Sequence, residues 1–142
     1  MDLITLNFKF YMIILSIFYI SEGLMSIFFI NLSTKFTRWF YGFDSKLERK
    51  FILICKPWGS NVFIAGVLAL FVFSNPSRYI GGAICLAILL SLRIYYRLRF
   101  REDIKKEFKT PLYRNYISVL LLLYGMVSIL LWLIKEILLA RI

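Results

Sequence analysis

Glu22 and Arg93 are charged residues within long apolar stretches, where an ionisable side chain usually faces a helix bundle or a water-filled cavity. If both stretches are membrane helices, a rise of about 1.5 Å per residue places Glu22 about 18 Å from a boundary near Phe10. The same count places Arg93 about 21 Å from the same boundary, near Tyr79. We therefore predict that the two side chains lie at one level. They would form a structural ion pair, or Glu22 would serve as a proton-linked or substrate-binding carboxylate; in a third interpretation Glu22 reaches the interface or a partner chain.

The sequence contains no histidine, which excludes His-ligated haem, His-based metal sites and Ser-His or Cys-His nucleophiles within this chain. The two cysteines, Cys55 and Cys85, fall near opposite faces of the membrane in the topology described below. They are too far apart for an intrachain disulfide and are expected to be small buried side chains. We predict no catalytic residue, metal site or cofactor.

Composition indicates that these residues belong to a membrane protein. Of the 142 residues, 61% are hydrophobic and 18% are aromatic, whereas roughly half of a soluble domain is apolar. At roughly 20 residues per crossing, the length allows four spans in one domain. The predicted fold is an all-α bundle of four transmembrane helices, at about 8–32, 57–74, 79–96 and 111–134. Asp2 weakens the positive n-region of a signal peptide, so the first span is expected to be retained.

The positive charges indicate the orientation of the spans. The chain has 18 Lys and Arg against 8 Asp and Glu, a net charge of +10. Fourteen of these cations lie in the connection between the first two spans and in the segment from Arg93 to Arg114. The positive-inside rule then places both connections in the cytoplasm and both termini on the non-cytoplasmic side of a bacterial-type inner (plasma) membrane. Because the charge follows topology, nucleic-acid binding is not expected.

The two basic connections have different predicted structures. Residues 33–56 mix aromatic and basic side chains, as an amphipathic interfacial segment does, with a helix starting at Ser45 and Pro57 in the first turn of the next span. Residues 93–110 contain no helix breaker and are expected to continue the third span as a basic stem. Its candidate contacts with anionic lipid are Arg97, Arg99, Arg101, Lys105 and Lys106. Charge that only fixes topology is the alternative, favoured by the nearby Asp103 and Glu107.

Small residues mark a packing face on the third span. They are Gly81, Gly82, Ala83, Ala87 and Ser91, and Ala65 and Ala69 have similar spacing on the second span. Small faces let membrane helices approach closely. We expect packing within the bundle, and packing between protomers is the alternative.

A weak internal repeat relates the two halves of the chain. The second span opens with Pro57 and Asn61, and the fourth opens with Pro111 and Asn115 at the same spacing. Parallel repeats of this kind occur in membrane transporters. Chance similarity of two helix starts explains the pattern equally well.

Scattered glycines mark the spans: Glu22-Gly23 in the first, Trp58-Gly59 at the start of the second, and Arg78 followed by Gly81-Gly82 at the start of the third. In these glycines and in its architecture, and not in a diagnostic motif, the chain resembles the DoxX-like group of small four-helix bacterial membrane proteins. The resemblance covers the whole chain and implies a helical bundle without implying a reaction.

The predicted function is that of an accessory, scaffold or lipid-interacting membrane component. The alternative is a small oligomeric transporter or channel that uses Glu22. An intramembrane enzyme or redox component ranks last, because the sequence has no histidine and no metal-spaced cysteines. The expected partners are membrane lipids, anionic ones included, and a second copy of the chain or a partner membrane protein.

Overall fold

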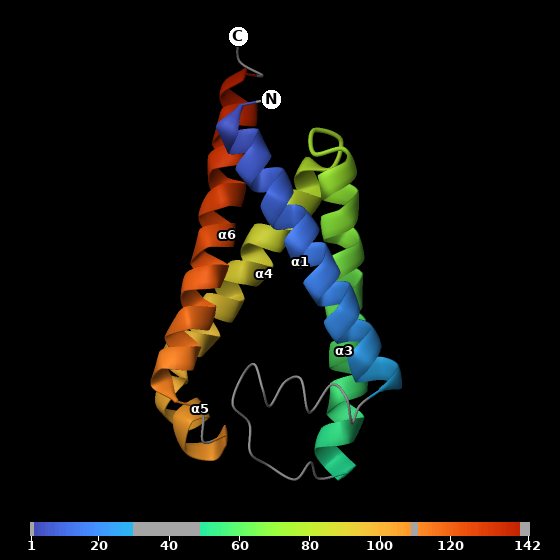
Figure 1. The fold of residues 1–142 in the computed structure, drawn as a ribbon, viewed down its shortest axis with the longest axis vertical. Coiled ribbons are helices and arrows are strands. Elements are labelled where there is room, and N and C mark those ends of the chain that lie inside the picture. The colour runs from blue at the N-terminus through green and yellow to red at the C-terminus, as the bar shows by residue number, and fades with distance from the viewer. Residues whose placement is uncertain (1, 30–48, 109–110, 140–142) are drawn as a thin grey trace.

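The chain forms a bundle of four long helices. The computed structural model describes residues 2–29, 49–108 and 111–139, and all regular elements in these ranges are helical. They are α1 (Leu3–Phe28), α3 (Arg49–Ser74), α4 (Ile80–Arg99), the short α5 (Arg101–Phe108) and α6 (Leu112–Leu139). The long helices alternate in direction, so both chain termini lie at one end, called the terminal end here; the opposite end is the connection end (Figure 1).

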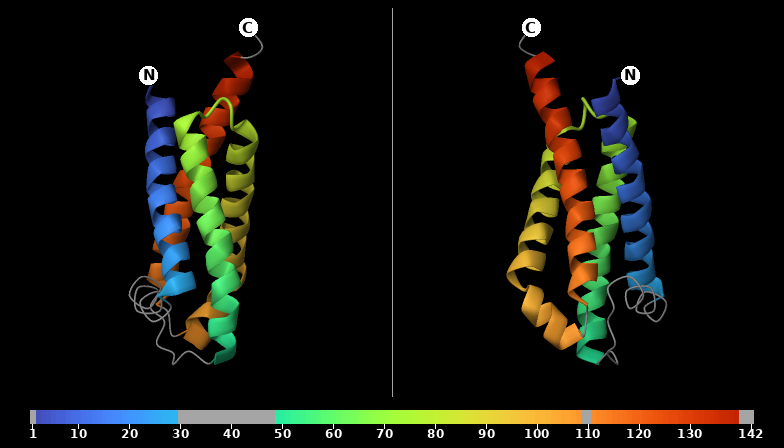
Figure 2. Two further views of the ribbon diagram at one scale, coloured as in Figure 1. Left: turned by 90° about the vertical axis from the view of Figure 1, so that its right-hand side faces the viewer. Right: turned by 60° about the vertical axis from the view of Figure 1, so that its left-hand side comes forward.

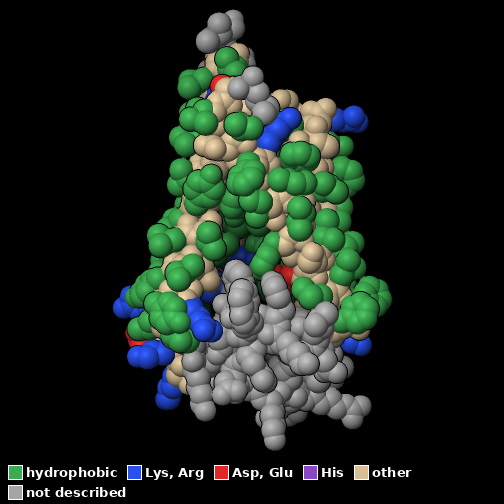
Figure 3. Space-filling view, viewed as in Figure 1, with side chains coloured by type: hydrophobic (Ala, Val, Ile, Leu, Met, Phe, Trp, Pro, Cys, Tyr) green, Lys and Arg blue, Asp and Glu red, His purple; other side chains and the backbone are tan. Residues whose placement is uncertain are grey.

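Four helical segments are long and apolar enough to cross a membrane. They are α1, the Lys56–Ser74 part of α3, α4 and α6. Large apolar side chains are exposed along all four, as an apolar solvent requires. Figure 3 shows them covering the face formed by α1 and α6, with Lys and Arg concentrated toward the two ends. The prediction of an all-helical bundle with four helices long and apolar enough to cross a membrane is confirmed for the described residues.

The first helix starts earlier and the last helix ends later than predicted, whereas the first helix ends at Phe28 and not at the predicted 32. Helix α1 begins at Leu3, because the Asp2 side chain caps it by accepting a hydrogen bond from the Thr5 amide at 3.0 Å. Helix α6 continues to Leu139 and therefore includes Lys135 and Glu136. The apolar count placed these ends too far inside the helices, because polar residues belong to their first and last turns.

Two predictions about helix ends are wrong. Pro57 stands at the start of the apolar span, as predicted, but not in the first turn of a helix: it lies inside α3, which begins at Arg49. A membrane helix tolerates an internal proline because its neighbours can compensate for the lost backbone hydrogen bond. The basic stem is not continuous either, since α4 ends at Arg99 and, after a break at Phe100, α5 begins at Arg101. Glu102 and Asp103 lie in the first turn of α5, where acidic groups favour a new helix start. The predicted helix start at Ser45 and most of the interfacial segment lie outside the described residues.

Helices α1 and α4 cross, so each helix changes its neighbour along the bundle. At the terminal end α1 packs on α6 through a stack of Phe8 on Trp132, with ring centroids 4.3 Å apart. At the connection end α1 packs on α3, while α4 lies beside α6 (Figures 1 and 2). Residues 75–79 form a short connection between α3 and α4 at the terminal end.

Glycines allow a close contact between α1 and α3. A Cβ atom at Gly23 in α1 would lie 2.6 Å from the Phe63 Cβ atom and 2.8 Å from the Gly59 carbonyl oxygen in α3. Any larger residue would force the backbones apart. This crossing fixes the level at which the neighbouring residues Glu22 and Trp58 project.

The packing face predicted on α4 is present in part. Ala83 and Ala87 are buried, and a Cβ atom on Gly82 would lie 2.9 Å from side-chain atoms of both Leu68 and Val72 in α3. Ser91 is exposed and bonds back to the Ala87 carbonyl at 2.8 Å. Gly81 faces open space with nothing within 4 Å, so it has no packing role inside the described bundle. Packing between α1 and α3 at Gly23 and Gly59 was not predicted.

Candidate functional site

Polar and aromatic side chains from all four long helices meet in the half of the bundle nearer the connection end. We call this group the polar cluster. It consists of Tyr19 and Glu22 from α1, Trp58 from α3, Arg93 and Arg97 from α4, and Asn115 from α6. Figure 3 shows the surface hollowed between α1 and α6, with basic atoms deep in the hollow and acidic atoms on its α1 side.

The cluster lies close to one end of its helices. Glu22 is six residues from the end of α1 at Phe28, and Arg93 is six residues from the end of α4 at Arg99. At a rise of 1.5 Å per residue, both lie about 9 Å from those ends. The prediction that Glu22 and Arg93 lie at one level agrees with this placement. The site is therefore nearer to the connection end than to the middle of the membrane.

Arg93 of α4 contacts aromatic side chains of α1 and α3 across the polar cluster. Its Nη1 atom donates a hydrogen bond to the Tyr19 hydroxyl at 2.6 Å, and its Cζ atom lies 4.5 Å from the centroid of the same ring. The Trp58 ring centroid lies 5.3 Å from the same Cζ atom. Such contacts between a guanidinium group and aromatic rings are attractive and stronger when water is excluded. The Arg93 Nε atom is buried and has no hydrogen-bond partner among the described residues.

Glu22 is the acidic member of the cluster. Its Oε2 atom is buried and also has no hydrogen-bond partner among the described residues. Arg93 and Arg97 lie within electrostatic range of its carboxyl group. The ion pairs within 4.0 Å among the described residues do not include one between Glu22 and Arg93. The structure thus brings the two predicted residues into one cluster, with Tyr19 rather than Glu22 as the direct partner of Arg93.

Asn115 fixes the second arginine of the cluster. The Arg97 Nη1 atom donates to the Asn115 Oδ1 atom at 3.1 Å, and the Asn115 Nδ2 atom donates to the Arg97 carbonyl at 3.0 Å. Asn115 is only 2% exposed. In the sequence, Asn115 stands out only through its repeat with Asn61. In the structure Asn61 is exposed and Asn115 is buried, so the two positions are not equivalent. An asparagine a few residues inside an apolar span was the sequence feature that could have identified Asn115.

The other candidate lipid contacts lie outside the cluster. Arg99, Arg101, Lys105 and Lys106 are exposed at the end of α4 and on α5. Arg101 pairs weakly with the neighbouring Glu102 at 3.7 Å. Arg97 differs from them because it is half-buried and held by Asn115.

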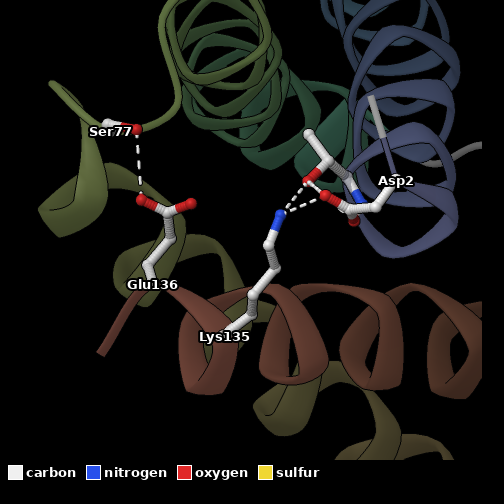
Figure 4. A network of polar contacts seen from close by, with 5 residues as sticks. Asp2, Ser77, Lys135 and Glu136 are labelled. Carbon is white, nitrogen blue, oxygen red and sulfur yellow. Dashed lines mark hydrogen bonds and ion pairs between the residues drawn. The ribbon is translucent and has the colours of Figure 1, made fainter. Parts of the chain in front are cut away.

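A second polar network, not predicted from the sequence, closes the terminal end. Lys135 of α6 donates to the Asp2 carboxylate and, at 2.8 Å, to the Thr5 hydroxyl, both at the start of α1. Ser77, before α4, donates to Glu136 at 3.2 Å. We call these five residues the terminal clasp (Figure 4). The hydrogen bonds from Lys135 and from the Thr5 amide lower the pKa of Asp2 below its usual range.

The remaining reactive side chains do not form a site. Cys85 is a free thiol and is exposed on α4, so the prediction that it is buried is wrong; the Cys55 side chain lies outside the described residues. Within the described ranges, no three acidic or cysteine side chains come together as metal ligands would. The polar cluster can bind an anion through Arg93, or a cation or a proton through Glu22.

Comparison of the chain with family models, with curated proteins and with solved structures gives no match. The DoxX-like resemblance therefore stays a prediction.

Proposed function

We propose that this protein is a non-enzymatic, lipid-interacting membrane component that binds a phospholipid headgroup at Arg93. The observation that carries the proposal is the buried Arg93 Nε atom, an N–H donor without a hydrogen-bond partner among the described residues, near one end of α4. A guanidinium group recognises phosphate with two parallel hydrogen bonds, so a phosphate oxygen fits this donor well.

The surroundings of Arg93 support a ligand that enters from the membrane. Arg93 lies about 9 Å from the end of α4, a short step below the headgroup region. Arg97 and the exposed Arg99 continue the line of positive charge toward that region, where clustered cations attract anionic headgroups. Aromatic neighbours of the kind that Tyr19 and Trp58 provide are typical of membrane interfaces.

The proposal includes an orientation. The connection end, which carries most Lys and Arg, faces the cytoplasm of a bacterial-type cell, and the bound lipid belongs to the inner leaflet. Single cysteines introduced at Asn75 and at Arg101 in a cysteine-free chain test this. A membrane-impermeant maleimide added outside intact cells should label the first and spare the second, and the reverse pattern would refute the orientation.

Lipid retention by the purified full-length protein tests the binding itself. Native mass spectrometry after exchange into lipid-free detergent should detect a retained phospholipid on the unaltered protein and its loss in Arg93→Gln. The matched control is Arg99→Gln, which removes an exposed cation from the same helix and should keep the lipid. Arg93→Lys preserves the charge but lacks the Nε–H donor and should bind more weakly than the unaltered protein. Equal retention in Arg93→Gln would contradict the proposal.

A small oligomeric transporter or channel is the second candidate, favoured by the unpartnered Glu22 Oε2 atom. An unpaired carboxyl buried in a span is costly and often belongs to a substrate or proton path. In this case proteoliposomes should show a proton or solute flux that Glu22→Gln abolishes. Flux that is the same in Glu22→Gln and in the unaltered protein would exclude a role of Glu22 in transport.

A further inference from the structure

We infer that Glu22 makes the site selective for a phosphate group linked to a primary ammonium, as in an ethanolamine phospholipid. The inference rests on the proposed function, because it assigns the part of the headgroup that Arg93 does not bind. Its basis is a pair of buried, unpartnered atoms of opposite character in one cluster: the Nε–H donor of Arg93 and the Oε2 acceptor of Glu22.

These two atoms specify different parts of one ligand. A buried donor or acceptor that stays unpaired costs free energy, so a ligand is favoured when it satisfies both atoms. The Nε–H group requires an acceptor, which a phosphate oxygen supplies. The Glu22 oxygen requires a donor, and a primary ammonium supplies three N–H donors together with a positive charge.

The two charged groups are not paired with each other. Among the described residues, Arg93 donates to the Tyr19 hydroxyl, and no ion pair within 4.0 Å joins it to Glu22. Their mutual influence is therefore longer in range. An ethanolamine headgroup, whose phosphate and ammonium are joined by an ethylene bridge, provides opposite charges a short distance apart.

Neighbouring residues strengthen the distinction between headgroups. Trp58 is 50% exposed beside Arg93, and an indole ring attracts a cationic headgroup as well as the guanidinium. A purely anionic headgroup such as phosphatidylglycerol would place only hydroxyl groups near Glu22. A hydroxyl group carries no charge, so its hydrogen bond lacks the Coulomb attraction that an ammonium adds at the Glu22 carboxylate.

Competition between lipids tests the inference. Offered equal amounts of phosphatidylethanolamine and phosphatidylglycerol in mixed micelles, the unaltered protein should retain mainly phosphatidylethanolamine. Glu22→Gln should lower that preference about tenfold, the typical effect of one charge-assisted hydrogen bond. The matched control, Glu102→Gln, removes an exposed acid of α5 and should leave the preference unchanged. An unaltered preference in a Glu22→Gln protein that still binds lipid would overturn the inference and leave the proposed function intact.

Altered ligands provide a test that does not depend on the folding of a variant. Phosphatidylcholine carries a quaternary ammonium, which cannot donate a hydrogen bond to Glu22, so the unaltered protein should bind it less well than phosphatidylethanolamine. Equal binding of these two lipids would overturn the inference. If the protein retains no phospholipid at all, the proposed function fails instead. Soluble phosphoethanolamine should not displace the lipid; displacement would overturn the lipid assignment and identify a soluble phosphate ester as the ligand.

Discussion

At the terminal end, Lys135 donates hydrogen bonds to Asp2 and Thr5 at the start of α1. At the connection end, by contrast, Glu22 and Arg93 each have a buried polar atom without a hydrogen-bond partner among the described residues. The first group is partly exposed, and each of its five side chains takes part in a hydrogen bond. The second is half-buried and incompletely paired.

Paired and incompletely paired polar networks indicate different roles in a membrane bundle. A partly exposed network of paired side chains fastens helices together and leaves little capacity for a ligand, and such networks contribute only modest stability. A buried group without a partner costs stability and persists where it has another use. By this reasoning the terminal clasp is structural and the polar cluster is the functional site.

The largest expected effect comes from separating the helices that hold the polar cluster. Gly23→Ala places a Cβ atom against the Phe63 and Gly59 backbones and should destabilise the protein by about 1–3 kcal/mol. The matched control is Gly81→Ala, where the new atom meets open space. Its stability should stay unchanged or rise by up to about 1 kcal/mol. Thermal unfolding in detergent measures both, and an equal loss in the two variants would show that the α1–α3 contact does not determine the effect.

A smaller effect should distinguish coupling within the cluster from coupling within the clasp. Arg93→Gln leaves the Glu22 carboxyl without one of its two nearby cations and should lower stability, while adding Glu22→Gln should restore part of the loss. The double-mutant cycle should give a coupling energy of about 1 kcal/mol or more. The parallel cycle with Lys135→Met and Asp2→Asn should give a smaller value, because that pair is more exposed. The opposite order would reverse the assignment of the two regions.

The smallest effect is a pH dependence of the clasp. The pKa of Asp2 is lowered in the native state, so its stabilising contribution is complete above the unfolded-state value of about 3.9 and is lost as the pH falls toward the native value. Stability should therefore decline below about pH 4, less steeply in Lys135→Met than in the unaltered protein. Chemical denaturation between pH 3 and pH 6 measures the slopes, with Glu136→Gln as a control that keeps the Lys135 contact. Identical slopes in Lys135→Met and the unaltered protein would contradict the ion pair.

The sequence predicted the fold better than it predicted the site. Apolar length and composition were sufficient to identify four spans, because the membrane requires them of any crossing helix. The level of Glu22 and Arg93 followed from counting residues along helices. The Tyr19 and Asn115 contacts could not be predicted, because they depend on the rotation of α1 and α6 about their own axes. That rotation is set by close packing at positions such as Gly23 and Gly59.

A distance measurement between Arg93 and a lipid phosphate is the most direct test of phosphate binding at Arg93. Solid-state NMR of the protein in phosphatidylethanolamine bilayers, with labelled arginine guanidinium carbons, detects dipolar coupling to lipid phosphorus. If Arg93 binds the phosphate, one strongly coupled guanidinium signal should be seen. It should disappear in Arg93→Gln and persist in Arg99→Gln. A coupling pattern that Arg93→Gln leaves unchanged would show that the phosphate is bound elsewhere and would contradict its binding at Arg93.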